Sequence, residues 1–231
     1  MESGILPIYP VIENLDHVDF ASDIRWNGSP DVVEPTLPPG SPSGRKLVSE
    51  ATDLRCVPDE TYDSVLSSHC LEHVADPLRA LREWKRVCSP SGVLCLIVPH
   101  RDGAFDWKRP VTSIDHLRDD AAAQMGEDDK THFQETLLLH DLRRDRRNAP
   151  RSNLEARVAD NLRLRGVHHH VFDLSVAVAA VKEAGWTPLA AEARRPFHIV
   201  VLARNDSSPS DFARKSVMRG SPFKSDRSSL C

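Results

Sequence analysis

The sequence of 231 residues lacks the features that mark several classes of protein. No apolar run approaches membrane-spanning length and no signal peptide is visible, so we expect a cytoplasmic protein that contacts no membrane. The five cysteines are odd in number and show no Cys-x-x-Cys spacing, which favours reduced thiols over a disulfide framework. The formal net charge is only −4, with both signs mixed along the chain, so nucleic acid is not an expected partner.

The length suffices for one domain with a sizeable core and additional segments. We expect a single α/β domain over residues 1–204, in which residues 100–170 form a helical insertion. Residues 205–231 are rich in Ser, Arg, Lys and Asp and bring little apolar surface, so we expect this tail to be disordered. Its removal should therefore leave the thermal midpoint unchanged.

The most informative segment runs from Asp63 to Pro99. The short apolar runs Asp63–Ser68 and Val93–Val98 predict two buried strands. Between them, Ala75–Cys88 has apolar residues at helical spacing, and Asp76-Pro77 can cap its start. A strand, a helix and a strand of this length predict a parallel crossover unit, whose ligands bind at the carboxyl ends of the strands. The first strand ends there in a polar cluster: Ser67, Ser68 and His69, and then Glu72 and His73.

The remaining expected elements flank this unit. Strands are expected at Leu15–Phe20 and Lys46–Ala51, on either side of a proline-rich loop at 29–45. The insertion is expected to hold three helices, at Ile114–Gln124, Thr131–Leu142 and Ser152–Leu164. A further helix is expected at Ser175–Ala184, followed by a strand pair at Thr187–Ala193 and His198–Ala203.

A series of short motifs covers residues 45–100. It comprises Asp53-Leu54, Pro58-Asp59, Tyr62-Asp63, Val65, Leu71-Glu72-His73, Asp76-Pro77, Arg86-Val87 and Pro90-Ser91-Gly92. Together these motifs resemble the middle region of the class I methyltransferases that use S-adenosylmethionine, of the methyltransferase type 11-like group. The resemblance implies an α/β fold with a doubly wound, mostly parallel sheet that ends in an antiparallel strand pair. It also implies S-adenosylmethionine as cofactor and a methyl acceptor, a small molecule or another group, that the sequence does not identify.

The resemblance also implies roles for particular residues. Asp19 would bind the ribose of the cofactor, and Asp53 and Leu54 would contact the adenine. Ser67 and Ser68 would line the methionine end. The catalytic candidates are His69 and His100, because the ordinary pKa of histidine lies near neutrality and suits a general base.

The chain departs from this family at its N-terminal side. Class I methyltransferases begin with a strand and a Gly-x-Gly-x-Gly-like loop, which lets the backbone approach the cofactor. Before Asp19 the sequence has one glycine, Gly4, and Pro7 and Pro10 disfavour a central strand. We therefore expect the fold to lack the first strand of the family and methyl transfer to be impaired. The sequence leaves open whether it starts after that loop or whether its first residues fill the gap differently.

Two other functions stay open on the sequence alone. Without the Gly-rich loop, the chain could be a non-catalytic methyltransferase-like module that binds a partner. The eleven histidines, among them the run His168–His170, could build a metal-dependent hydrolase. His69 and His73 have the spacing of two ligands on a helical turn, but they are expected on a loop, where that spacing carries little weight. No metal ligand is assigned, and the oligomeric state is left open.

Overall fold

The computed structural model describes residues 12–20, 44–145, 150–206 and 220–228. The strands are β1 His17–Asp19, β2 Lys46–Val48, β3 Tyr62–Ser68, β4 Cys88–Pro99, β5 Thr187–Arg194 and β6 His198–Arg204. The α-helices are α1 Pro77–Val87, α2 Ile114–Ala123, α3 Phe133–Leu139, α4 Arg151–Ala159, α5 Asn161–Leu164, α6 Leu174–Glu183 and α8 Lys224–Ser228. Two 3₁₀ helices, η2 Leu71–His73 and η3 Arg101–Gly103, follow β3 and β4.

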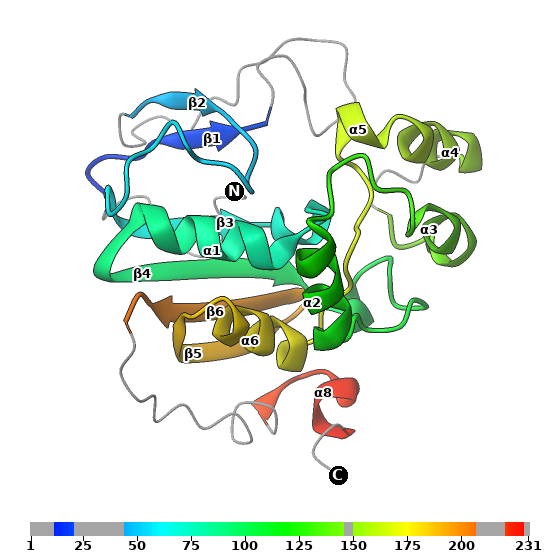
Figure 1. Ribbon diagram of the computed structural model, residues 1–231. Helices are drawn as coiled ribbons and strands as arrows, with labels where there is room; N and C mark the ends of the chain where they lie inside the picture. The colour runs from blue at the N-terminus through cyan, green and yellow to red at the C-terminus, as the bar shows by residue number, and fades with distance from the viewer. Residues whose placement is uncertain (1–11, 21–43, 146–149, 207–219, 229–231) are drawn as a thin grey trace.

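The main sheet has the strand order β3-β4-β6-β5. β3 runs parallel to β4, whereas β6 is antiparallel to both of its neighbours, so the expected C-terminal strand pair is confirmed. The helices α1, α6 and α2 lie over one face of this sheet (Figure 1). The largest core cluster lies between them and includes Leu78, Leu81, Leu96, Val181 and Ile199. The fold is therefore mixed α/β, as the sequence predicts, but the described strand pairings are half parallel and half antiparallel rather than mostly parallel, because β6 runs against both of its neighbours.

β1 and β2 form a separate parallel pair, in which His17 lies opposite Lys46. The Tyr62 hydroxyl donates a hydrogen bond of 2.8 Å to Asp16 Oδ2, which joins the amino end of β3 to that of β1. Hydrogen bonds from Arg45 hold the pKa of Asp16 at about 2. Among the described strands none pairs with the edge of β3 that lies away from β4. The sequence leaves open whether the first strand of the family is missing or is replaced by residues 1–11. These residues lie outside the described part of the chain.

The α1–β4 unit forms for the local reasons that its sequence indicates. Asp76 caps α1 by accepting a 2.9 Å hydrogen bond from the Arg79 amide, and Pro77 occupies the first turn. The apolar positions of α1 are buried, as their spacing predicts. β4 begins at Cys88, five residues earlier than expected, and includes Gly92. A Cβ at Gly92 would lie 2.6 Å from the Cys88 sulfur and 2.8 Å from the Asp63 carbonyl oxygen, so only glycine fits.

The insertion and the tail differ from expectation in two respects. The helix expected at Thr131–Leu142 is confined to α3, and the one expected at Ser152–Leu164 is divided into α4 and α5. The tail expected to be disordered is packed in part, because Phe223 is 7% exposed and Asp226 is fully buried. The expectation of disorder is thus wrong for residues 220–228, while 207–219 and 229–231 lie outside the described residues. No described helix has the length and apolar character that crossing a bilayer requires.

Candidate active site

The polar cluster predicted after β3 lies at the carboxyl edge of the sheet, at the right in Figure 1. The chain leaves β3 through His69, whose φ of 52° is left-handed, and enters η2. The His69 amide donates a 2.9 Å hydrogen bond to the Ile97 carbonyl, which fixes this turn against β4. A non-glycine residue held in this conformation is strained, and such residues cluster at functional sites.

Two serines at the end of β3 have unsatisfied side chains. The Oγ atoms of Ser67 and Ser68 are buried, and neither has a hydrogen-bond partner among the described residues. A buried hydroxyl without a partner costs free energy unless water or a ligand satisfies it. The two serines thus have the polar atoms that a bound ligand could satisfy, at the place where the sequence predicts the methionine end of the cofactor.

Carboxylates surround the turn after β3. Burial and the negative charges of nearby acidic groups raise the pKa of the Cys70 thiol to about 12. The acidic groups responsible are Glu72, Glu127, Glu50 and Asp19. Arg165 pairs with two of them, Glu50 and Glu127. Asp19, the last residue of β1, keeps a side chain that is 33% exposed, with Lys46 Nζ 3.9 Å from its Oδ2. The surroundings of Cys70 therefore carry a net negative charge that favours a cationic ligand.

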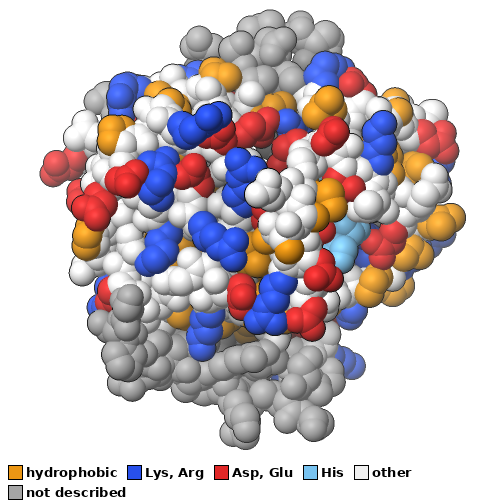
Figure 2. All heavy atoms as spheres, in the orientation of Figure 1, with side chains coloured by type: hydrophobic (Ala, Val, Ile, Leu, Met, Phe, Trp, Pro, Cys, Tyr) orange, Lys and Arg blue, Asp and Glu red, His pale blue; other side chains and the backbone are white. Residues whose placement is uncertain are grey.

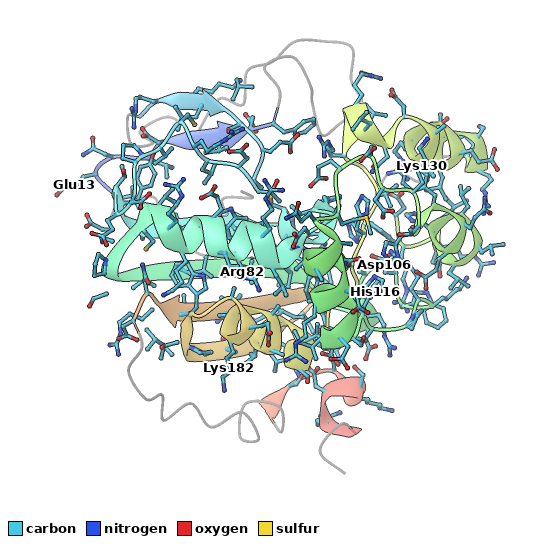
Figure 3. All side chains as sticks on the ribbon, in the orientation of Figure 1. Glu13, Arg82, Asp106, His116, Lys130 and Lys182 are labelled. Atoms are coloured by element: carbon cyan, nitrogen blue, oxygen red, sulfur yellow. The ribbon has the colours of Figure 1, made fainter. Side chains whose placement is uncertain are left out.

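The other two predicted cofactor residues have protein partners. The Asp53 carboxylate accepts hydrogen bonds of 2.8 and 2.7 Å from the Arg55 guanidinium, and the buried Leu54 donates its amide to Glu83. Asp53 lines an open groove of about 470 Å³ with Arg79 and other side chains of α1. Basic side chains gather over α1 in Figure 2. Arg82 projects from this helix, away from Asp106 and His116 (Figure 3). The adenine contacts of Asp53 and Leu54 stay predictions.

His69 is oriented by a buried carboxylate. Its Nδ1 lies 3.3 Å from Glu72 Oε1, and its Nε2 lies 3.1 Å from His198 Nδ1. Burial alone would raise the pKa of Glu72, but the neighbouring imidazoles of His69, His73 and His168 hold it below its ordinary value. An ionised Glu72 places the His69 proton on Nδ1 and leaves Nε2 as the acceptor. The His69 side chain is 27% exposed, so it can act as a general base toward a ligand at this edge once its Nε2 leaves the contact with His198.

The second catalytic candidate, His100, is a structural residue. It is completely buried, and its ring stacks on Phe223 with the centroids 3.8 Å apart. Its Nδ1 accepts a 3.1 Å hydrogen bond from the Asp102 amide, so its Nε2 carries the proton and lies 3.2 Å from Asp226 Oδ2. Both ring nitrogens are occupied and neither reaches solvent. The surroundings of His100 therefore give its predicted catalytic role no support.

In two places among the described residues, three side chains bring together atoms that could bind one metal ion. The first group consists of Glu72, His73 and His168. The Nδ1–H of His73 donates to the Val167 carbonyl at 3.0 Å, and the Nδ1 of His168 is hydrogen-bonded to the Asp106 carboxylate. Both rings thus turn Nε2 toward the interior of the group. Neither oxygen of Glu72 has hydrogen-bond geometry with a described partner. This group shares Glu72 with the proposed base His69 and belongs to the same site.

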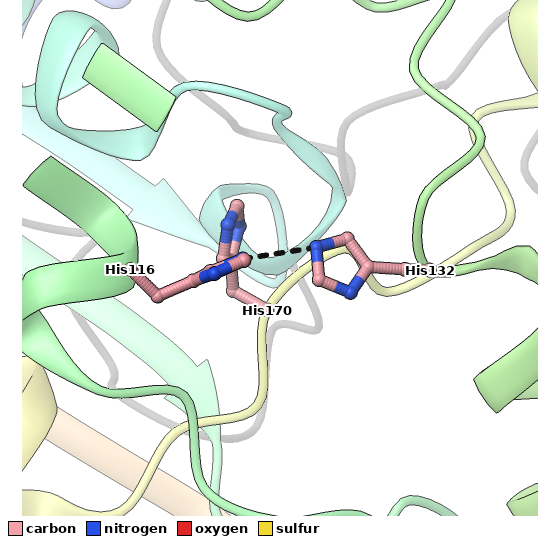
Figure 4. Close-up of side chains that lie close together, drawn as sticks. All are labelled: His116, His132 and His170. Atoms are coloured by element: carbon pink, nitrogen blue, oxygen red, sulfur yellow. Dashed lines mark hydrogen bonds between the residues drawn. The ribbon is translucent and has the colours of Figure 1, made fainter. Parts of the chain in front are cut away.

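The second group consists of His116, His132 and His170, drawn in Figure 4. One ring nitrogen of each lies within 4.8 Å of the others. Asp120 adjoins the group, with its Oδ2 2.9 Å from His170 Nε2 and 3.4 Å from His116 Nε2. Burial lowers the pKa of both His132 and His170, which favours their neutral, metal-binding form.

The structure also brings together residues that sequence reasoning missed. His198 was read only as the start of a strand, and nothing local connects it with His69, 129 residues earlier. Asp120 could have been found, because it lies four residues after His116 in the expected helix and so on the same face.

Comparison with known proteins gives one family and several structures. A family model described as a methyltransferase domain matches residues 37–96. No curated protein matches the chain.

The similar solved structures include methyltransferases of low sequence identity. A SAM dependent methyltransferase from Aquifex aeolicus is 15% identical, with a TM-score of 0.38 over 71% of this chain and 55% of that one. An S-adenosylmethionine dependent methyltransferase from Mesorhizobium loti is 16% identical, with a TM-score of 0.46 over 83% and 80%. A putative methyltransferase from Bacillus halodurans is 12% identical, with a TM-score of 0.45 over 86% and 85%. The chain therefore spans about half the length of the Aquifex protein.

Proposed function

We propose that the chain is a class I methyltransferase-like protein, because residues 37–96 match a methyltransferase domain, and that it transfers a methyl group from S-adenosylmethionine to an unidentified acceptor. The observation that carries this proposal is the carboxyl edge of the sheet, where Ser67 and Ser68 end β3 and His69 follows it. Ligands of open α/β sheets bind at this edge. The acceptor is a small molecule or another nucleophile whose identity the site does not specify.

The residues at this edge fit the cofactor. The buried hydroxyls of Ser67 and Ser68 have no described partner and can bind its amino acid part. Asp19, which is one-third exposed at the end of β1, can accept hydrogen bonds from the ribose. The negative charge around Cys70 suits a sulfonium cation. When bound, S-adenosylmethionine supplies an activated methyl group, and the protein has to align an acceptor with it.

His69 supplies the proton transfer in this proposal. Its Nε2 leaves the contact with His198 Nδ1 and takes the proton from an acceptor hydroxyl or amine as the methyl group is transferred. Glu72 Oε1 lies 3.3 Å from the opposite Nδ1, and its negative charge stabilises the imidazolium that forms, which is the role of a carboxylate behind a catalytic histidine. A module that only binds the cofactor would need no such pair. The Glu72–His69 arrangement therefore favours an enzyme over the alternative of a non-catalytic binding module.

The cofactor part of the proposal predicts a loss of affinity on substitution of Asp19. We expect Asp19→Asn to weaken the binding of S-adenosylmethionine about tenfold or more, because a charge-assisted hydrogen bond contributes roughly 1.5–3 kcal/mol. Isothermal titration calorimetry measures this directly. Asp63→Asn is the matched control, because Asp63 is an exposed carboxylate near the opposite end of β3 and should leave affinity unchanged. Equal affinities of the Asp19→Asn variant and the wild type would place the ribose elsewhere.

A further inference from the structure

We propose that His116, His132 and His170, together with Asp120, form a binding site for a divalent transition-metal ion of the zinc class. The sequence alone led to no metal ligand, so this assignment comes from the arrangement of the side chains. It concerns a different set of atoms from the proposed methyl-transfer site, and it does not depend on that activity.

The first argument is the spacing of the ligand atoms. His116 Nε2 and His132 Nε2 are 3.2 Å apart, as the dashed line in Figure 4 marks. Asp120 Oδ2 lies 3.4 Å from His116 Nε2 and 2.9 Å from His170 Nε2. A zinc ion with bonds of about 2.0–2.1 Å holds tetrahedral ligands about 3.3–3.4 Å apart. The three imidazole nitrogens lie within 4.8 Å of one another, and three of the contacts among these four side chains are close to the spacing in such a site.

The second argument is the orientation of His170. Its Nδ1–H donates a 3.1 Å hydrogen bond to the Val74 carbonyl, so Nε2 is the ring nitrogen that faces Asp120 Oδ2, at a distance of 2.9 Å. A backbone carbonyl behind a ligating histidine is the usual outer contact of a metal site, because it fixes both the tautomer and the ring.

The proposed ligands come from three separate segments of the chain and differ in solvent exposure. His116 and Asp120 lie one turn apart on α2, His132 precedes α3, and His170 lies in the segment before α6. The His170 side chain is 1% exposed and that of His132 is 15% exposed, whereas that of His116 is 39% exposed. The ion would therefore enter from the side of His116 and join three separate segments.

Such an ion would also stabilise the neighbouring turn. The His170 amide donates a 3.3 Å hydrogen bond to the carbonyl of Glu72, the residue that orients His69. The alternative for the same geometry is an imidazolium–carboxylate pair between His170 and Asp120 that needs no metal. Measurement of metal content separates these two arrangements.

The test uses the full chain, purified and then loaded with zinc. We expect one zinc ion per chain by elemental analysis, and a visible absorption spectrum of tetrahedral Co²⁺ after cobalt replaces zinc. His116→Ala should weaken zinc binding roughly tenfold or more in competition with a chromophoric chelator. This variant should keep its fold, which circular dichroism verifies, because the side chain that it removes is partly exposed.

Two further variants make the result specific. Asp120→Asn should weaken zinc binding, while Asp119→Asn, the exposed neighbour on the same helix, should not. Glu72→Gln should leave this ion bound, because Glu72 belongs to the other group of possible metal ligands, with His73 and His168. Absence of stoichiometric zinc in the wild type, or loss of the ion in Glu72→Gln with retention in His116→Ala, would overturn the assignment.

Discussion

Replacement of Arg109 with Met is expected to lower the free energy of unfolding by about 3–5 kcal/mol, the range for removal of one partner from a buried ion pair. The Arg109 side chain is only 1% exposed. Its guanidinium donates to Asp106 at 3.3 Å, to Glu135 at 3.0 Å, and to the carbonyls of His168 and His169 at 2.7 and 3.2 Å. Methionine fills a similar volume but leaves these acceptors, among them the buried Asp106 carboxylate, without their donor.

Urea denaturation measures this change, and Arg118→Met is the matched control. Arg118 also pairs with two carboxylates, Asp115 and Glu183, but its side chain is half exposed. Exposed ion pairs contribute about 0–1 kcal/mol, so we expect a small effect. Equal losses in the two variants would show that the buried cluster around Arg109 does not stabilise the fold as described.

Replacement of Asp226 with Ala is expected to destabilise the protein by about 3 kcal/mol, since hydrogen bonds to charged groups contribute roughly 1.5–3 kcal/mol and their loss leaves buried groups unpaired. Asp226 is fully buried. Its carboxylate accepts from the Leu174 amide at the start of α6 at 3.2 Å, is hydrogen-bonded to the Ser221 hydroxyl, and lies 3.2 Å from His100 Nε2. The thermal midpoint should therefore drop clearly, and deletion of residues 220–231 should have at least the same effect.

The control for this prediction is Asp115→Ala, because the Asp115 side chain is 80% exposed. Its thermal midpoint should stay close to that of the wild type. An unchanged midpoint in the 220–231 deletion would restore the expectation from sequence that the tail does not contribute to the fold.

The sequence predicted those parts of the fold that depend on residues close together in the chain. The Asp76 cap, Pro77 and the apolar spacing of α1 lie within one short segment, and each feature is found in the structure. The strand pair β5–β6 was likewise recognisable from two apolar runs around a short turn. The polar cluster after β3 followed from the parallel crossover, because the topology decides at which edge a strand ends.

Contacts between distant residues account for what the sequence did not predict. His100 follows a strand end and so resembled a catalytic histidine, but its partner Asp226 lies 126 residues away. The tail had too little apolar content to predict its packing, because what holds it is a buried carboxylate as well as Phe223. The roles of Asp19 and Asp53 depend on the bound cofactor and stay predictions.

The most direct test of the proposed site is hydrogen–deuterium exchange of the full chain with and without saturating S-adenosylhomocysteine. We expect slower amide exchange in peptides that contain Asp19 and in those that cover 67–73, because both lie at the carboxyl edge where the ligand would bind. Peptides from the outer face of α1, around Arg79 and Arg82, should be unchanged. Protection confined to α1 and the Asp53 groove, or no protection anywhere at millimolar ligand, would contradict the assignment of this edge as the cofactor site.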